Sequence, residues 1–248
     1  MRFLCLHGSL SSGSTFDAQL GPLQQNLAAD NAASFYFINA QLYGTAPEGN
    51  EGFFGPKPHY RWLDYQGVET EALHQSVRGA RGNSDAPAEE LLSEMMPVNL
   101  TWANHKDIME YLDKNLEENP DIEGICGYSE GASMAATYIL HEQKMEQEHG
   151  RPRRIKCGIF FTGLPPIDEK KGYIFADQRE EMVDIQSIHV IGAADPFRCG
   201  ADSLYNVCDP DTAQFFDTGK GHTVPRSGPI ITELGDAIRE MIQRAKEE

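Results

Sequence analysis

Ser129 stands between Gly127 and Gly131 in the stretch "GYSEG", at the end of an apolar run. The run before it has the pattern of a buried strand, and the residues after it have the pattern of a helix. A tight turn between the two would force unusual backbone angles on the serine, and the glycines would remove colliding side chains. The hydroxyl would then be exposed above the strand end. This spacing predicts a serine nucleophile; the alternative is an ordinary helix N-cap serine.

A serine hydroxyl is a weak nucleophile unless a base takes its proton, and a carboxylate must orient that base. In a strand–turn–helix arrangement the expected chain order is serine, acid, histidine. Asp195 directly follows the apolar strand pattern "SIHVIGAA", and His222 lies in a glycine-rich loop before the last helix pattern. We predict that Ser129, Asp195 and His222 form a catalytic triad. Asp202 and Asp217 remain open as alternative acids.

The other histidines fit the position of the base less well. His189 lies inside the strand pattern before Asp195 and is expected to be a core residue. His7 ends a strand pattern and is expected to shape the loop that follows. The remaining five lie far from the expected loop or near the charged end of a helix: His59, His74, His105, His141 and His149.

Acyl transfer also needs backbone N–H donors for the oxyanion of the tetrahedral intermediate. Glu130 follows the nucleophile at the start of the predicted helix, so its amide is the expected first donor. The strand that ends in His7-Gly8 continues into a loop of small residues, "SLSSG". We expect the second donor there, from Ser9 as first choice and Leu10 as second.

Strand and helix patterns alternate along most of the chain, which predicts an α/β fold with a mostly parallel sheet and helices on both faces. No linker separates a second core-sized unit, so we predict one domain over 1–248. The region from about 43 to 99 is too long for a simple loop, and we expect it to be an irregular, lid-like insert. The expected strands are 2–8, 34–42, 122–129, 155–163, 187–195 and 213–218, and the expected helices are 15–28, 101–119, 130–148 and 228–248.

Aromatic residues are concentrated in the glycine- and proline-rich part of the insert. An apolar acyl chain would need such a surface, so these residues are candidates for substrate binding. The alternative is that they anchor the insert to the core. They are Phe53, Phe54, Tyr60, Trp62 and Tyr65.

The formal net charge of −17 argues against binding to nucleic acid, because the only dense basic cluster is that around Arg151–Arg154. The sequence contains no apolar run of about 18 residues, so no membrane span is expected. The N-terminal stretch lacks the length and cleavage site of a signal peptide. These features predict a protein of the cytoplasm.

Cysteine and histidine spacing gives no indication of a metal site or another cofactor, since neither HExxH nor paired Cys/His motifs occur. Cys5, Cys126 and Cys157 each lie inside an apolar run and are expected to be reduced core residues. Cys199 and Cys208 lie in a loop-like stretch, and the sequence leaves open whether they pair.

Several stretches together resemble the fungal family of serine hydrolases, a compact branch of the α/β hydrolases. They are "RFLCLHG", "GPKPHYRWLDY", "GYSEGAS", "GAADPF" and "GHTVP". The resemblance extends from about Arg2 to Arg239 and implies an α/β-hydrolase fold with about six strands. It also implies that Ser129, Asp195 and His222 match the family's nucleophile, acid and base.

Members of this family hydrolyse esters or thioesters, and some release finished polyketide chains from their synthases in secondary metabolism, as in the lovastatin type. The resemblance therefore implies a small acyl ester or thioester as substrate, and extends to an acyl chain on a carrier protein. In this chain Glu130 stands where the family frequently has glutamine, and a carboxylate there would disfavour an anionic acyl chain.

Three other functions stay open. A substrate hydroxyl or carbon nucleophile could intercept the acyl-enzyme, which would make the protein a cyclase or acyl transferase. A general short-chain carboxylesterase would use the same triad. A binding protein on an inactive hydrolase scaffold is the third alternative. Carrier-protein docking would need a basic patch, and the only dense one, at 151–156, is expected at the end of the sheet opposite the active site.

Overall fold

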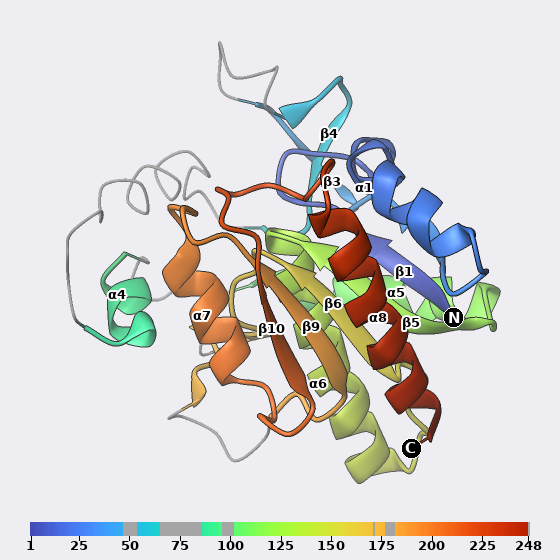
Figure 1. The fold of residues 1–248 in the computed structure, drawn as a ribbon. Helices are drawn as coiled ribbons and strands as arrows, with labels where there is room; N and C mark the ends of the chain where they lie inside the picture. The colour runs from blue at the N-terminus through green and yellow to red at the C-terminus, as the bar shows by residue number, and fades with distance from the viewer. Residues whose placement is uncertain (47–53, 65–85, 96–101, 171, 177–181, 248) are drawn as a thin grey trace.

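A six-stranded sheet forms the centre of the computed structural model, which describes residues 1–46, 54–64, 86–95, 102–170, 172–176 and 182–247 (Figure 1). Its strands are β1 (Arg2–Leu6), β2 (Ser34–Ile38), β5 (Ile122–Tyr128), β6 (Cys157–Phe161), β9 (Gln186–Ile191) and β10 (Ala213–Asp217). The order is β10-β9-β6-β5-β1-β2, and every neighbouring pair is parallel. The predicted sheet is confirmed, with each expected strand present.

Side chains alternate between the two faces of each strand, and both faces are covered. In β1, Leu4 and Leu6 contact one apolar cluster, whereas Phe3 and Cys5 contact the other. The strands β6 and β9 are buried along their whole length. Burial on both faces explains why these strands appear in the sequence as continuous apolar runs.

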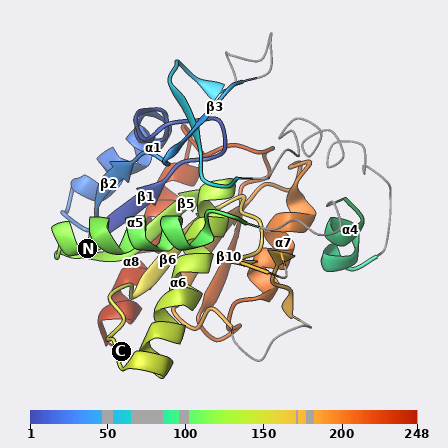
Figure 2. The ribbon, with the colours of Figure 1, turned by 180° about the vertical axis from the view of Figure 1, so that it is seen from behind.

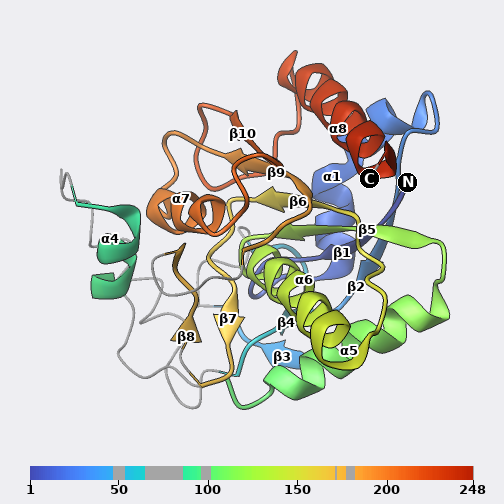
Figure 3. The same ribbon diagram turned by 90° about the horizontal axis from the view of Figure 1, so that it is seen from below.

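Two layers of helices cover the sheet (Figures 1, 2 and 3). Helices α1 (Gly13–Ala28) and α8 (Ile230–Glu247) pack on one face, with α5 (His105–Glu118), α6 (Glu130–His149) and α7 (Arg198–Asn206) on the other. Among the described helices, none is long and apolar enough to cross a membrane. The layered arrangement leaves the ends of the strands, rather than their faces, open for a site.

Helix α1 continues without a break through Pro22. Ser12 caps the helix by accepting a hydrogen bond from the Thr15 N–H at 3.2 Å. The helix buries Phe16, Leu20, Leu23 and Leu27 against the sheet. This apolar stripe stabilises the helix despite the backbone hydrogen bond that proline cannot donate.

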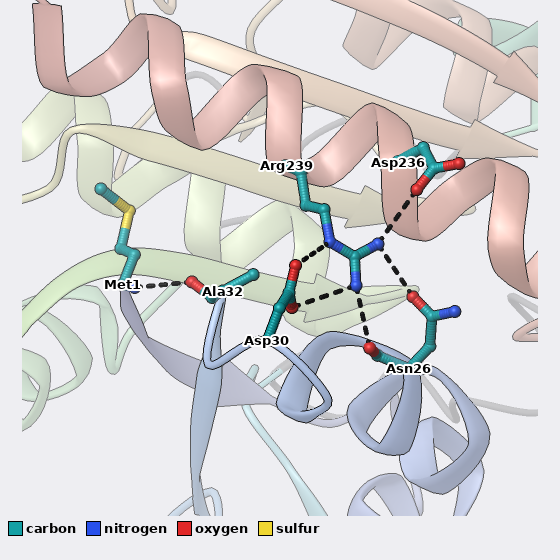
Figure 4. A network of polar contacts seen from close by, with 6 residues as sticks. All are labelled: Met1, Asn26, Asp30, Ala32, Asp236 and Arg239. Atoms are coloured by element: carbon teal, nitrogen blue, oxygen red, sulfur yellow. Dashed lines mark hydrogen bonds and ion pairs between the residues drawn. The ribbon is translucent and has the colours of Figure 1, made fainter.

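A polar network joins α1 to α8 (Figure 4). The Arg239 guanidinium donates to both carboxylate oxygens of Asp30 and to the side-chain and backbone oxygens of Asn26. It lowers the pKa of the Asp30 carboxyl. Beside it, the Met1 ammonium donates to the Ala32 carbonyl at 2.8 Å. The contacts of Arg239 thereby hold α1 and α8 together on the same face of the sheet.

Residues 198–206 form helix α7, where the sequence analysis expected only a loop. Its buried face includes Ala201 and Leu204. These apolar residues are too few to give a recognisable helical period in the sequence. Cys199 lies in this helix and Cys208 follows it, and both are free thiols. The disulfide that the sequence left open is therefore not formed.

The region 43–99 is less irregular than predicted. It contributes to an antiparallel pair, β3 (Leu42–Gly44) with β4 (His59–Arg61), and contains helix α4 (Ala88–Met95), which packs against α7. A second small pair, β7 (Ile167–Asp168) with β8 (Gly172–Tyr173), lies outside the insert. The positions 47–53, 65–85 and 96–101 lie outside the described residues, so the role of the insert as a lid stays a prediction.

His189 is buried inside β9, as expected, with only 1% of its surface exposed. Its ring lies 4.9 Å from that of Phe160 and 5.2 Å from that of Tyr205, measured between ring centroids. Burial lowers the pKa of His189 to about 3. The folded protein therefore holds this imidazole neutral at pH values where an unfolded chain would protonate it.

This difference predicts a loss of stability in mild acid. Between pH 6.5 and 3 the unfolded chain binds a proton at His189 that the folded state does not, so the free energy of unfolding falls as the pH falls. From pH 7 to pH 5 we expect His189 to contribute a loss of about 2 kcal/mol. Urea unfolding at both pH values measures it, and in His189→Phe the difference between the two pH values should shrink by that amount. If His189→Phe lost as much stability between pH 7 and pH 5 as the wild-type protein, this contribution of His189 would be contradicted.

Candidate active site

Ser129 alone forms the turn between β5 and α6. Its φ of 54° and ψ of −119° are strained for a residue with a side chain. Three backbone hydrogen bonds hold it. Its N–H donates to the Phe161 carbonyl at 2.9 Å, and its carbonyl accepts the N–H groups of Ala132 at 2.9 Å and Ser133 at 3.3 Å. The Ser129 side chain makes no capping hydrogen bond to α6. The alternative of an ordinary N-cap serine is therefore wrong.

Two glycines allow this turn by letting backbone segments touch. A Cβ on Gly127 would lie 2.4 Å from the Gly131 carbonyl oxygen. A Cβ on Gly131 would lie 2.1 Å from the carbonyl oxygen of Leu6 and 2.5 Å from that of His7. These neighbours are backbone atoms and cannot rotate away. The first turn of α6 is thereby packed directly against the end of β1.

The three predicted triad residues lie together in one hydrogen-bonded chain. His222 Nε2 is 3.0 Å from Ser129 Oγ, and His222 Nδ1 is 2.8 Å from Asp195 Oδ2. The Asp195 side chain is fully buried and that of His222 is 13% exposed. Because Nδ1–H donates to the carboxylate, Nε2 is free to accept the serine proton. This arrangement is chemically competent for nucleophilic attack by Ser129.

Further contacts fix the imidazole and the carboxylate. The Tyr128 hydroxyl donates to the His222 carbonyl at 3.0 Å, and burial together with the charge of Asp195 raises the pKa of this phenol. The Phe197 ring lies 4.8 Å from the imidazole, and the Phe197 N–H donates to Asp195 Oδ1 at 2.8 Å. Neither Tyr128 nor Phe197 was among the predicted site residues, although Tyr128 directly precedes Ser129 and Phe197 lies two positions after Asp195.

The alternative acids have other partners. Asp202 pairs with Arg198 one turn earlier in α7, at 3.2 Å. Asp217 accepts the backbone N–H of Gly219 at 2.8 Å in an exposed turn. Neither carboxylate is hydrogen-bonded to His222, whereas Asp195 is. Geometry thus favours Asp195 among the three.

The loop after β1 passes directly beside Ser129. A Cβ on Gly8 would lie 3.4 Å from Ser129 Cβ, so the backbone at this glycine is adjacent to the serine. Leu10 has a φ of 55°, unusual for leucine, and its side chain is buried. The N–H groups of Ser9 and Leu10 have no hydrogen-bond acceptor within the described parts of the chain. Both are thus available as oxyanion donors.

His7 shapes this loop rather than acting as a base. Its Nε2 accepts the Ala40 N–H at 3.0 Å, so Nδ1 carries the proton and donates to the Gly8 carbonyl at 2.7 Å. The imidazole is fully buried, and burial lowers its pKa to about 4. A neutral imidazole with both nitrogens occupied cannot accept a proton from Ser129.

Three of the five predicted substrate-binding aromatics are described, and all anchor the insert. Phe54 packs in a small cluster with Leu10. Tyr60 forms a backbone bridge with Ser11, through hydrogen bonds of 2.8 and 3.2 Å. Trp62 is only 1% exposed. Their contact with a substrate stays a prediction, and two lie outside the described residues: Phe53 and Tyr65.

The Glu130 carboxylate lies inside the protein, with 3% of the residue exposed. Its Oε2 accepts the backbone N–H of Trp62 at 3.1 Å. Its position beside Ser129 predicted a carboxylate that faces the substrate, but the structure shows it hydrogen-bonded to the protein backbone. Sequence alone gave no signal for this contact, because glutamate in a first helical turn is usually exposed.

Comparison with known proteins identifies the family of the chain. The family model described as "Serine hydrolase (FSH1)" matches residues 1–234. "Hydrolase phiM" of Fungal sp. (strain ATCC 74256) is 25% identical, and the alignment covers 97% of this chain and 95% of that protein. "Esterase FPY3" of Fusarium mangiferae is 23% identical over 99% of this chain and 98% of that protein.

Solved structures support the fold. Esterase PE8 is similar with a TM-score of 0.57 and 19% identity, covering 97% of this chain and 92% of that one. SOBER1 of Arabidopsis thaliana has a TM-score of 0.53 and 17% identity, covering 99% and 100%. The predicted α/β-hydrolase fold is confirmed. Since the family model extends over nearly the whole sequence, the protein belongs to the serine hydrolase (FSH1) family and is a hydrolase.

Proposed function

We propose that the protein cleaves acyl esters or thioesters through an acyl-enzyme on Ser129. The observation that carries this proposal is the hydrogen-bonded chain from Ser129 Oγ through His222 to the buried Asp195. The strained backbone at Ser129 supports it, since such strain is common at functional residues. The family to which the chain belongs supports hydrolysis as the reaction class.

In the first half-reaction Ser129 Oγ attacks the acyl carbonyl carbon while His222 Nε2 takes the hydroxyl proton. The carbonyl π electrons move to oxygen and form an oxyanion, and Asp195 stabilises the imidazolium. When the intermediate collapses, the bond to the leaving oxygen or sulfur breaks, and His222 returns its proton to that atom. Water then attacks the acyl-enzyme with His222 as base, which releases the acid and restores Ser129.

The oxyanion requires donors placed where negative charge develops. We assign these to the backbone N–H of Glu130 and to that of Ser9, with Leu10 as the alternative. Glu130 is the first residue of α6, where the helix dipole favours negative charge. The loop that carries Ser9 and Leu10 is held against Ser129 by the close approach at Gly8.

A small, freely diffusing ester or thioester is our preferred substrate. The alternative is release of a polyketide or other acyl chain from a carrier protein. Docking of an acidic carrier would need accessible cations. Four basic residues lie between α6 and β6, near the amino ends of the strands and opposite Ser129. Three of them are paired with acids, and Arg154 donates to the Asn119 carbonyl at 3.2 Å. The pairs are Arg151 with Asp113, Arg153 with Glu146 and Asp184, and Lys156 with Glu123.

We also propose that the protein acts in the cytoplasm. The support is the state of its cysteines: all five are free thiols, and four of them are buried. Free buried thiols are typical of proteins kept in a reducing compartment.

Substitution of the nucleophile tests the reaction. Ser129→Ala should reduce turnover of p-nitrophenyl esters and acyl thioesters by at least about 10⁴-fold, because no other group can form the acyl-enzyme. Thioester turnover that rises with acyl length would favour an acyl-releasing thioesterase, whereas a maximum on short esters would favour a carboxylesterase. Cyclic products would favour the cyclase. Turnover that survives in a folded Ser129→Ala protein would contradict the mechanism.

A second prediction separates the three candidate acids. Asp195→Asn should lower kcat by about 10⁴-fold, because an amide can no longer hold the imidazole in the required tautomer. Asp202→Asn and Asp217→Asn are matched controls on nearby elements and should keep kcat within about threefold of the wild-type value. Steady-state rates on one ester compare all three. A larger loss in either control than in Asp195→Asn would reassign the acid.

A further inference from the structure

Trp62 donates two hydrogen bonds from a buried position. Its indole N–H donates to the His7 carbonyl at 2.8 Å, and its backbone N–H donates to Glu130 Oε2 at 3.1 Å. Trp62 is 1% exposed and Glu130 is 3% exposed. Water therefore cannot replace either bond without entering the core. Both bonds are expected to hold Trp62, His7 and Glu130 firmly in their relative positions.

The two acceptors belong to the two segments that carry the proposed oxyanion donors. The His7 carbonyl lies at the start of the loop that leads to Ser9 and Leu10. Glu130 supplies the other proposed donor from its own backbone. Because Gly131 has no side chain, the His7 carbonyl also lies directly against the first turn of α6. One tryptophan thus connects both halves of the donor pair.

Trp62 is itself held from a third side. The Asn104 side-chain amide donates to the Trp62 carbonyl at 2.7 Å, and the Asn104 side-chain oxygen accepts the Asp64 N–H at 3.0 Å. Asn104 directly precedes α5. The tryptophan is therefore tied to the start of α5 as well as to the two segments that carry the proposed donors.

We propose that Trp62 and the Glu130 side chain are positioning residues that set the separation of the two oxyanion donors. This inference depends on the proposed function, since it concerns the tetrahedral intermediate of that reaction. Donor geometry matters most where the charge develops and much less for a neutral bound ester. The segment around Trp62 is thereby part of the catalytic geometry.

Trp62→Phe keeps an aromatic ring and the backbone N–H but removes the bond to His7. We expect kcat to fall about tenfold while KM stays within about twofold. The inhibition constant of an acyl trifluoromethyl ketone, which forms an oxyanion adduct with the serine, should rise by the same factor as kcat falls. The acid limb of the pH–rate profile should not move, because the pair of His222 and Asp195 is untouched.

The Glu130 bond is tested by a pair of substitutions. Glu130→Ala removes the acceptor for the Trp62 N–H and should lower kcat about tenfold. Glu130→Gln retains an acceptor oxygen and should recover most of that loss. The matched control is Trp102→Phe, which alters a second indole that is also 1% exposed and packs against Tyr173. It should leave kcat and ketone affinity at their wild-type values.

Several outcomes would overturn the inference. One is wild-type kcat and ketone affinity in both Trp62→Phe and Glu130→Ala. Another is a rise in KM alone in Trp62→Phe, which would make the tryptophan a substrate contact instead. Equal losses in Trp102→Phe would show a general effect on packing. If Trp62→Phe does not fold by circular dichroism, the Glu130 pair decides. Turnover retained in Ser129→Ala would instead remove the proposed function itself.

Discussion

The close approach of α6 to the ends of β5 and β1 is the constraint on which the site depends. At Gly131 the helix backbone meets the carbonyls of β1 and the following residue with no room for a side chain. This contact holds Ser129 in a conformation that its own side chain disfavours. The same contact brings the loop after His7 beside Ser129. Packing of the sheet and of α6 supplies the free energy that keeps the strained turn in place.

Sheet order then decides where the other groups lie. In a parallel sheet the carboxyl ends of all strands meet at one edge, so side chains that follow different strands converge there. Asp195 comes after β9 and His222 after β10, and both strands lie on the same side of β5, which leads into Ser129. The basic segment before β6 lies at the opposite edge. The basic residues and the proposed catalytic residues therefore lie at opposite ends of the strands.

The sequence predicted those features that depend on local pattern. Buried parallel strands produce continuous apolar runs, and the order of Ser129, Asp195 and His222 follows from strand ends and glycine-rich loops. Features that depend on distant contacts were not predictable. The burial of Glu130 depends on Trp62, 68 positions earlier in the chain. A side chain whose hydrogen-bond partner is such a distant backbone group cannot be recognised from the periodicity of the sequence around it.

The most direct test of this account is to locate the covalent adduct of a fluorophosphonate by peptide mass spectrometry. The account predicts a single phosphonyl group on Ser129, formed quickly in the wild-type protein and about 10³-fold or more slowly in His222→Ala, where no base takes the serine proton. Labelling of another residue, or hydrolysis of esters by a protein whose Ser129 is fully phosphonylated, would contradict Ser129 as the nucleophile.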